Sequence, residues 1–172
     1  MKISKPHATD YPSYYGTYIN KVTGDDLITA LVINFSETEK LIKTITEENL
    51  NYRYAEGKWT IKEILVHLMD AERIFAYRAL RFARQDKTDL PGFEENDYAP
   101  ASKASSRNID SIMQEFAALR KSTIELYKSF DEEQLNQSGT ANNNRITVRS
   151  LGYSTAGHEL HHIQVIRERY LS

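Results

Sequence analysis

The chain has 172 residues, a formal net charge of −2, 40% hydrophobic residues and 27% charged residues, which are ordinary values for a globular protein of one domain. This charge balance argues against a nucleic-acid partner. Because no apolar run reaches the length of a membrane span and no signal-peptide pattern opens the chain, we expect no membrane partner. The absence of cysteine excludes disulfides, thiolate metal ligands and a cysteine nucleophile, and it favours a cytoplasmic location.

Residues 1–22 predict an extended arm that packs on the body of the protein. Prolines and a glycine interrupt this stretch, which has no clear periodicity, and His7 within it is expected to be exposed and without a role. Its tyrosines each combine an apolar ring with a polar tip, which suits half-buried positions. They are Tyr11, Tyr14, Tyr15 and Tyr18. The first helix is then predicted to start near Asp25, with Thr23 as its N-cap.

The second helix has the clearest start signal in the chain, because Thr60 and Glu63 form a capping box. Trp59 and Ile64 are placed to form a hydrophobic staple around it. His67 borders the apolar stripe of this helix, where it is either a packed core residue or a metal ligand. Asp70 and Glu63 are candidates to orient its imidazole.

The arginines along the second helix predict a solvated basic face. They are Arg73, Arg78, Arg81 and Arg84. Residues 87–106 form the longest break, and Pro91, Gly92 and Pro100 punctuate it. We expect a long loop there, either a lid or an ordered crossover, with Phe93 and Tyr98 folded back onto the body.

A third helix is predicted from about Asn108 to Phe130, followed by a polar loop over residues 131–145 and a fourth helix that starts near Thr147. Gly152 and Gly157 weaken the fourth helix locally, and a glycine beside His158 permits close approach of a neighbouring helix or ligand. Four long helical patterns and no convincing strand predict an all-α four-helix bundle that spans residues 1–172 as one domain.

The fourth helix carries three of the five histidines, in the sequence GHELHH. His158 and His162 are four residues apart and can therefore point at one shared spot, as the ligands of a divalent ion do. A helix with clustered histidines and no metal is the alternative. The motif also reads HExxH, which makes Glu159 a candidate general base, although a surface carboxylate is the favoured interpretation.

A third ligand would have to come from another helix, and His67 is the candidate. Three neutral histidines leave the ion its full charge and one open position, at which the pKa of bound water falls towards about 7. Such a site suits hydrolysis, or the addition of a small thiol that must come as a co-substrate. Zinc fits these ligands, and nickel, cobalt and iron(II) also accept imidazole.

Three segments together resemble the DinB-like, or YfiT-like, superfamily. They are YAEGKWTIKEILVHLMDAERIFAYRALRFAR, LPGFEENDYAP and AGHELHHIQVIRERYL. The resemblance implies an up-down-down-up four-helix bundle, often a homodimer, with a divalent metal, zinc or nickel, held by His67, His158 and His162. His161 falls outside this triad. It also implies a small-molecule substrate and an activity as a metal-dependent hydrolase or a thiol-dependent transferase. A non-catalytic metal-binding or stress-related helical dimer is the alternative, and no catalytic residue is assigned.

Overall fold

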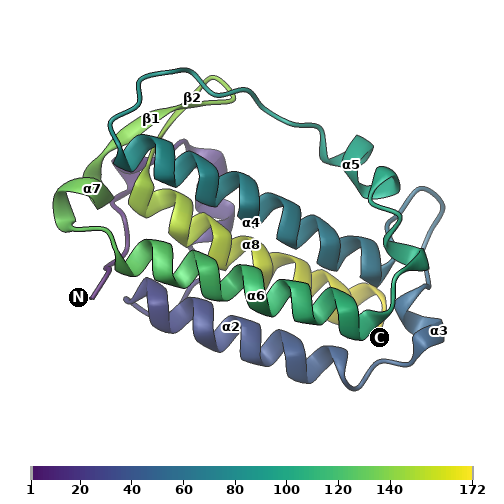
Figure 1. The fold of residues 1–172 in the computed structure, drawn as a ribbon. Coiled ribbons are helices and arrows are strands. Elements are labelled where there is room, and N and C mark those ends of the chain that lie inside the picture. The colour runs from purple at the N-terminus through teal and green to yellow at the C-terminus, as the bar shows by residue number, and fades with distance from the viewer. Residues whose placement is uncertain (1, 172) are drawn as a thin grey trace.

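Four long helices dominate the computed structural model, which describes residues 2–171 (Figure 1). They are α2 (Leu27–Ile42), α4 (Ile61–Ala83), α6 (Ile109–Lys128) and α8 (Val148–Arg169). The shorter α-helices are α1 (Gly16–Ile19), α3 (Glu47–Leu50), α5 (Glu95–Ala101) and α7 (Glu132–Asn136). The 3₁₀ helices are η1 (Ala8–Asp10), η2 (Ser13–Tyr15) and η3 (Ala104–Ser106). Two strands, β1 (Ser138–Ala141) and β2 (Asn144–Thr147), complete the described part.

The bundle has the up-down-down-up order that the resemblance implies. The chain reverses between α2 and α4, but the connection from α4 returns along the whole bundle, so that α6 runs in the same direction as α4 (Figure 1). Lys62, near the start of α4, accordingly donates to the Arg107 carbonyl just before α6, at 2.9 Å. α8 then runs parallel to α2 and antiparallel to α4. Two helices that are distant in sequence, α4 and α8, therefore share the most extensive contact.

Short polar side chains cap the long helices, and α4, α6 and α8 start where the sequence predicts. Thr60 and Thr147 accept bonds from the backbone N–H groups of Glu63 and Ser150, and Asn108 accepts from Asp110. The capping box of Thr60 and Glu63 is complete. For α2 the prediction is wrong, because Asp26 rather than Thr23 is the N-cap. Asp26 also accepts from the Ile3 N–H, so a contact with the distant arm favours it.

The polar residues 131–145 are not the predicted loop, because they form α7 and most of a β-hairpin. β1 and β2 pair antiparallel with Ala141 opposite Asn144, so only two residues make the turn. These residues, Asn142 and Asn143, have φ angles of 49° and 60°. Asparagine tolerates this left-handed conformation, and paired left-handed residues are typical of two-residue hairpins. The Asn-Asn pair was the sequence signal for this hairpin.

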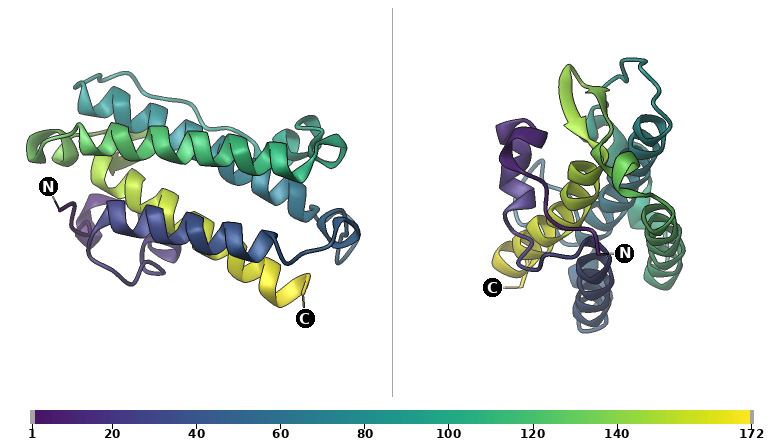
Figure 2. Two further views of the ribbon diagram at one scale, coloured as in Figure 1. Left: turned by 60° about the horizontal axis from the view of Figure 1, so that its bottom comes forward. Right: turned by 90° about the vertical axis from the view of Figure 1, so that its left-hand side faces the viewer.

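The two other irregular segments are also more ordered than predicted. The long connection contains α5 and η3, and the N-terminal arm contains η1, η2 and α1. The arm lies beside α8, as the purple segment of Figure 2 shows. Tyr11, Tyr15 and Tyr18 in it are partly buried as expected, but Tyr14 is 63% exposed. In the connection, Phe93 packs on the core while Tyr98 stays 46% exposed.

A buried arginine connects all four long helices. Arg120 of α6, 3% exposed, donates to both carboxylate oxygens of Glu72 on α4, at 2.8–3.2 Å, and to Glu159 on α8, at 2.8 Å. It also donates to the Leu31 carbonyl of α2 at 2.9 Å. Burial raises the pKa of Glu159, while Arg120 beside it and the Thr38 hydroxyl oppose that rise.

Replacing Arg120 by Met should destabilise the protein by about 3–5 kcal/mol, because Glu72 and Glu159 would stay buried without a countercharge. Urea denaturation would measure the free energy of unfolding. Arg149→Met is the matched control, since Arg149 is equally buried but pairs with Glu132, whose side chain is 63% exposed and can return to water. Equal losses in the two variants would contradict a special role for Arg120.

Candidate metal centre

Three histidine side chains from two helices meet inside the bundle. His67 comes from α4, and His158 and His162 come from α8. The Nε2 atom of His158 lies 3.1 Å from Nε2 of His67 and 3.1 Å from Nε2 of His162. The ligand atoms of all three lie within 4.8 Å of one another. The structure therefore brings together the three histidines that the sequence singles out as ligands.

Local helix geometry explains how these rings converge. His158 and His162 are one helical turn apart, so both face α4 from the same side of α8. Residue 67 lies two turns into α4, whose start is fixed by the cap at Thr60. Because α4 and α8 pack against each other over much of their length, this turn of α4 lies opposite the pair.

Burial keeps the three rings neutral. Burial lowers the pKa of His67 to about 4. It also lowers the pKa of His162, with a smaller contribution from the neighbouring histidines, to about 3. The pKa of His158 falls well below its ordinary value, first because of burial and then because of the other rings. Each imidazole therefore has a free nitrogen lone pair at neutral pH, which is the form that binds metals.

The spacing of the nitrogens fits a divalent ion. Two nitrogens that each lie about 2.0–2.1 Å from a tetrahedral ion are about 3.3 Å apart. The two Nε2 separations of 3.1 Å are close to that value. Among the described residues, the cluster contains three potential ligands and no more. The residues present therefore suit three-histidine coordination, which leaves one position of a tetrahedral ion open to solvent or substrate.

Aromatic rings surround the three histidines. The Trp59 ring centroid lies 4.7 Å from that of His67 and is stacked with His162 at 6.4 Å. Tyr18 meets the His158 ring edge-on at 5.2 Å, and Phe75 lies 6.2 Å from it. These side chains restrict the rotation of the imidazoles and exclude water from their flanks.

Gly157 allows the N-terminal arm to reach the site. A Cβ atom at this position would lie 2.1 Å from the backbone oxygen of Tyr18. The missing side chain therefore lets α1 pack directly on α8, which places the Tyr18 ring against His158. This confirms the expectation of close approach beside His158, and the approaching segment is α1.

A cavity of about 140 Å³ opens beside the histidines. His67 and His158 line it together with residues of the arm, of α4 and of the connection that precedes α5. Glu95 of α5 lies at its edge, with Oε2 3.9 Å from Nε2 of His67. Its side chain is 52% exposed, and partial burial, followed by the neighbouring Glu94, raises its pKa. Glu95 was not predicted as a site residue, since it lies in a segment expected to be a loop, and the family-like segment LPGFEENDYAP that contains it assigned it no role.

Several other predicted residues have different roles from those expected. Glu159 is 1% exposed rather than at the surface, and its carboxylate is bound by Arg120 and by Thr38, the latter at 2.7 Å. Glu159 is therefore held in the bundle interior and cannot act as a general base. Glu63 accepts from the Thr60 N–H at 2.7 Å and from Arg53 at 2.8 Å.

The remaining polar candidates lie outside the cluster. Asp70 pairs with Arg73 at 3.6 Å. His161 is half-buried, with its ring 5.1 Å from that of His162, and it does not join the cluster. His7 is exposed, as predicted.

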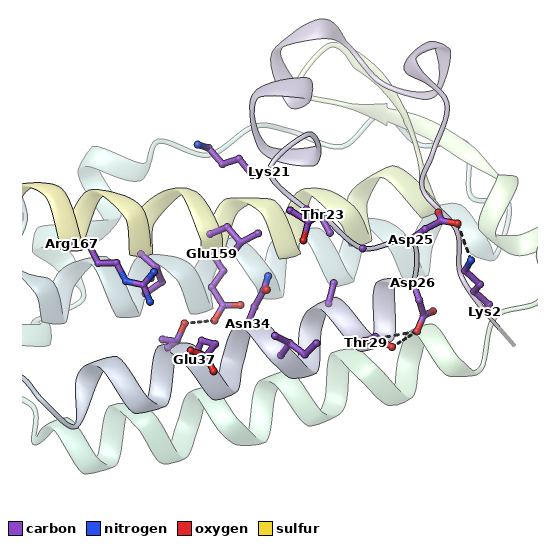
Figure 3. A pocket seen from close by; sticks show the side chains of 17 residues that line it. Lys2, Lys21, Thr23, Asp25, Asp26, Thr29, Asn34, Glu37, Glu159 and Arg167 are labelled. Atoms are coloured by element: carbon purple, nitrogen blue, oxygen red, sulfur yellow. Dashed lines mark hydrogen bonds and ion pairs between the residues drawn. The ribbon is translucent and has the colours of Figure 1, made fainter.

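A second cavity, of about 520 Å³, lies on a different face of α8, between α8 and α2. Asn34 and Glu159 point into the space between these helices, and charged side chains such as Lys21 and Arg167 surround it (Figure 3). None of the three clustered histidines lines this cavity. Its buried polar side chains are already bonded, Asn34 to the Ala156 carbonyl at 2.9 Å, Glu159 to Arg120, and Thr38 to Glu159. The second cavity is therefore separate from the histidine site.

The sequence matches the family model of the DinB superfamily over residues 30–166, which include all three histidines. Because this match covers most of the chain, the protein belongs to the DinB superfamily. None of the helices in residues 2–171 combines the length and the apolar character that crossing a bilayer requires.

Two curated proteins and the solved structure of a further protein are among those similar to the chain. A protein of Oceanobacillus iheyensis named "Putative metal-dependent hydrolase OB0413" is 26% identical over 152 residues, which are 86% of this chain and 87% of that protein. A "Putative metal-dependent hydrolase" of Geobacillus thermodenitrificans is 28% identical over 88 residues, 51% of this chain and 49% of the relative. The structure of YfiT from Bacillus subtilis, described as "a probable metal-dependent hydrolase with an unusual four-helix bundle topology", matches with a TM-score of 0.66 at 14% identity. The match covers 95% of this chain and 91% of that one, and it shows the shared fold.

Replacing Gly157 by Ala should destabilise the protein by about 1–3 kcal/mol, because the new methyl group would overlap the Tyr18 backbone. Thermal unfolding would measure the loss. Gly24→Ala is the matched control, since a Cβ there meets nothing within 4 Å, and it should change stability by less than about 0.5 kcal/mol. If both variants were as stable as wild type, the arm would not pack on α8 as described.

Proposed function

We propose that the protein is a metal-dependent hydrolase that acts on a small molecule through a divalent ion held by His67, His158 and His162. The observation that carries this proposal is the convergence of three neutral imidazoles beside an open cavity, with His67 and His158 buried and His162 partly buried. The names of the two curated relatives support the same class of activity.

The roles of the surrounding residues follow from their positions. A bound divalent ion would supply Lewis-acid chemistry to a substrate oxygen. Trp59, Tyr18 and Phe75 would keep water away from the flanks of the imidazoles. Glu95 would accept the proton of the attacking water, because it is the carboxylate beside the histidines and its pKa is raised towards the range that suits a general base.

The open side of the cluster favours catalysis over a purely structural or sensing site. A closed site would need a fourth protein ligand, and the described residues provide three. Transfer of a small thiol uses the same open position and stays a prediction from the sequence. The choice of zinc or nickel, the homodimer, the cytoplasmic location and the absence of a nucleic-acid partner also stay predictions.

Natively purified protein should contain about one divalent ion per chain, measured by elemental analysis. His158→Ala should lose this ion, because two imidazoles bind far more weakly than three. His161→Ala is the matched control, since His161 is next to the cluster but outside it, and it should retain the ion. Equal metal contents in His158→Ala and wild type would refute the site.

Glu95→Gln should lower turnover by about 100-fold or more, because it removes the proton acceptor, and it should leave the metal content unchanged. The assay would use the best substrate from a screen of simple esters and amides with metal-loaded protein. Asp97→Asn, an exposed change on the same short helix, should retain activity. A Glu95→Gln enzyme as active as wild type would exclude this role, and activity that survives metal removal would exclude the proposed function.

A further inference from the structure

One buried cation among residues 2–171 has no carboxylate partner. In the part of the chain that the structure describes, four lysine and arginine side chains are almost completely buried, and three of them pair with acids. Lys62 pairs with Glu47, Arg149 with Glu132, and Arg120 with Glu72 and Glu159. The fourth, Arg78, is 4% exposed, and no carboxylate of residues 2–171 lies within 4.0 Å of its guanidinium. Its polar contact is the Pro91 carbonyl, which accepts from Nη2 at 2.8 Å.

The neighbours of Arg78 do not supply the missing charge. Tyr15 lies near the guanidinium, but burial raises the pKa of its phenol, which therefore stays neutral at neutral pH. Desolvation in turn lowers the pKa of Arg78. A buried charge without a countercharge destabilises the folded state. The burial of Arg78 therefore requires an explanation other than a contribution to folding stability.

Arg78 lines the same cavity as the histidines. His67, Ala71, Phe75 and Arg78 form one stripe along α4, and all four line the cavity of about 140 Å³. His67 and Arg78 are eleven residues, or about 16 Å of helix axis, apart. Long side chains on a helix lean towards its N-terminus, which is the direction of His67. The cavity therefore has His67 and His158 at one end and a guanidinium at the other.

We infer that Arg78 binds a carboxylate group of the substrate, at the end of the cavity opposite the histidines. This inference rests on the proposed function, because the bound carboxylate is part of a substrate only if the histidines form the active site. A guanidinium matches the two oxygens of a carboxylate. A single negative charge also balances a single cation, whereas a dianionic phosphate would add a charge of the same sign as the nearby Glu95.

A first experiment tests Arg78 without any metal. The melting temperature of chelator-treated protein would be measured in propionate and butyrate at constant ionic strength, with propionamide and butyramide as neutral analogues. Wild type should be stabilised by the carboxylates and not by the amides, because a ligand that binds the native state raises stability. Arg78→Gln should lose this stabilisation. Arg84→Gln, which removes an exposed arginine that directly follows the same helix, should retain it.

A second experiment tests both ends of the cavity in cobalt-loaded protein. Mercaptopropionate and mercaptohexanoate would be compared with mercaptopropanol and mercaptohexanol, with the thiolate-to-cobalt absorption as readout. In wild type, at least one carboxylate should bind roughly 10- to 100-fold more tightly than its neutral analogue. Arg78→Gln should remove this preference, and Arg78→Lys, which keeps the charge but not the two-oxygen geometry, should retain part of it.

The outcomes separate the two proposals. If no thiol alters the cobalt spectrum, the proposed metal centre is wrong, while the melting experiment still decides the role of Arg78. If wild type does not distinguish carboxylates from neutral analogues in either experiment, or if Arg78→Gln distinguishes them as well as wild type does, the inference about Arg78 is overturned.

Discussion

The structure depends on the burial of one arginine among four helices. Arg120 bonds to a carboxylate of α4, a carboxylate of α8 and a backbone carbonyl of α2, while its own backbone belongs to α6. Phe35 and Phe116 lie against its guanidinium, at 5.9 and 5.1 Å from the ring centroids. Because ionic hydrogen bonds in such an interior tolerate little displacement, this network specifies how α4 and α8 lie relative to each other.

The histidine cluster requires this relative position of α4 and α8. Glu159 and His158 are consecutive on α8 and point in directions about 100° apart. Glu159 bonds to Arg120 in the bundle centre, while His158 faces His67 across the α4–α8 contact. The HExxH pattern in this protein therefore has a structural glutamate. Its histidines contribute to the cluster, and the carboxylate near the open side, Glu95, comes from another segment.

The sequence predicted the features that local chemistry determines. The cap at Thr60, the start of α8 at Thr147 and the one-turn spacing of His158 and His162 each depend on residues within a few positions of one another. The burial of Glu159 and of Arg78 was not predictable in this way. Each depends on partners or neighbours far along the chain, and a charged residue on a helix is exposed in most proteins. The hairpin at Asn142 and Asn143 had a local signal, which its polar flanks obscured.

X-ray absorption spectroscopy of zinc-loaded protein would show directly whether the three histidines bind one ion. Three imidazole nitrogens at about 2.0–2.1 Å from the ion are expected in wild type, and two in a His67→Ala variant. Three imidazoles that remain after the loss of His67, or a wild-type site with fewer than three, would contradict the claim that α4 and α8 together form one metal centre.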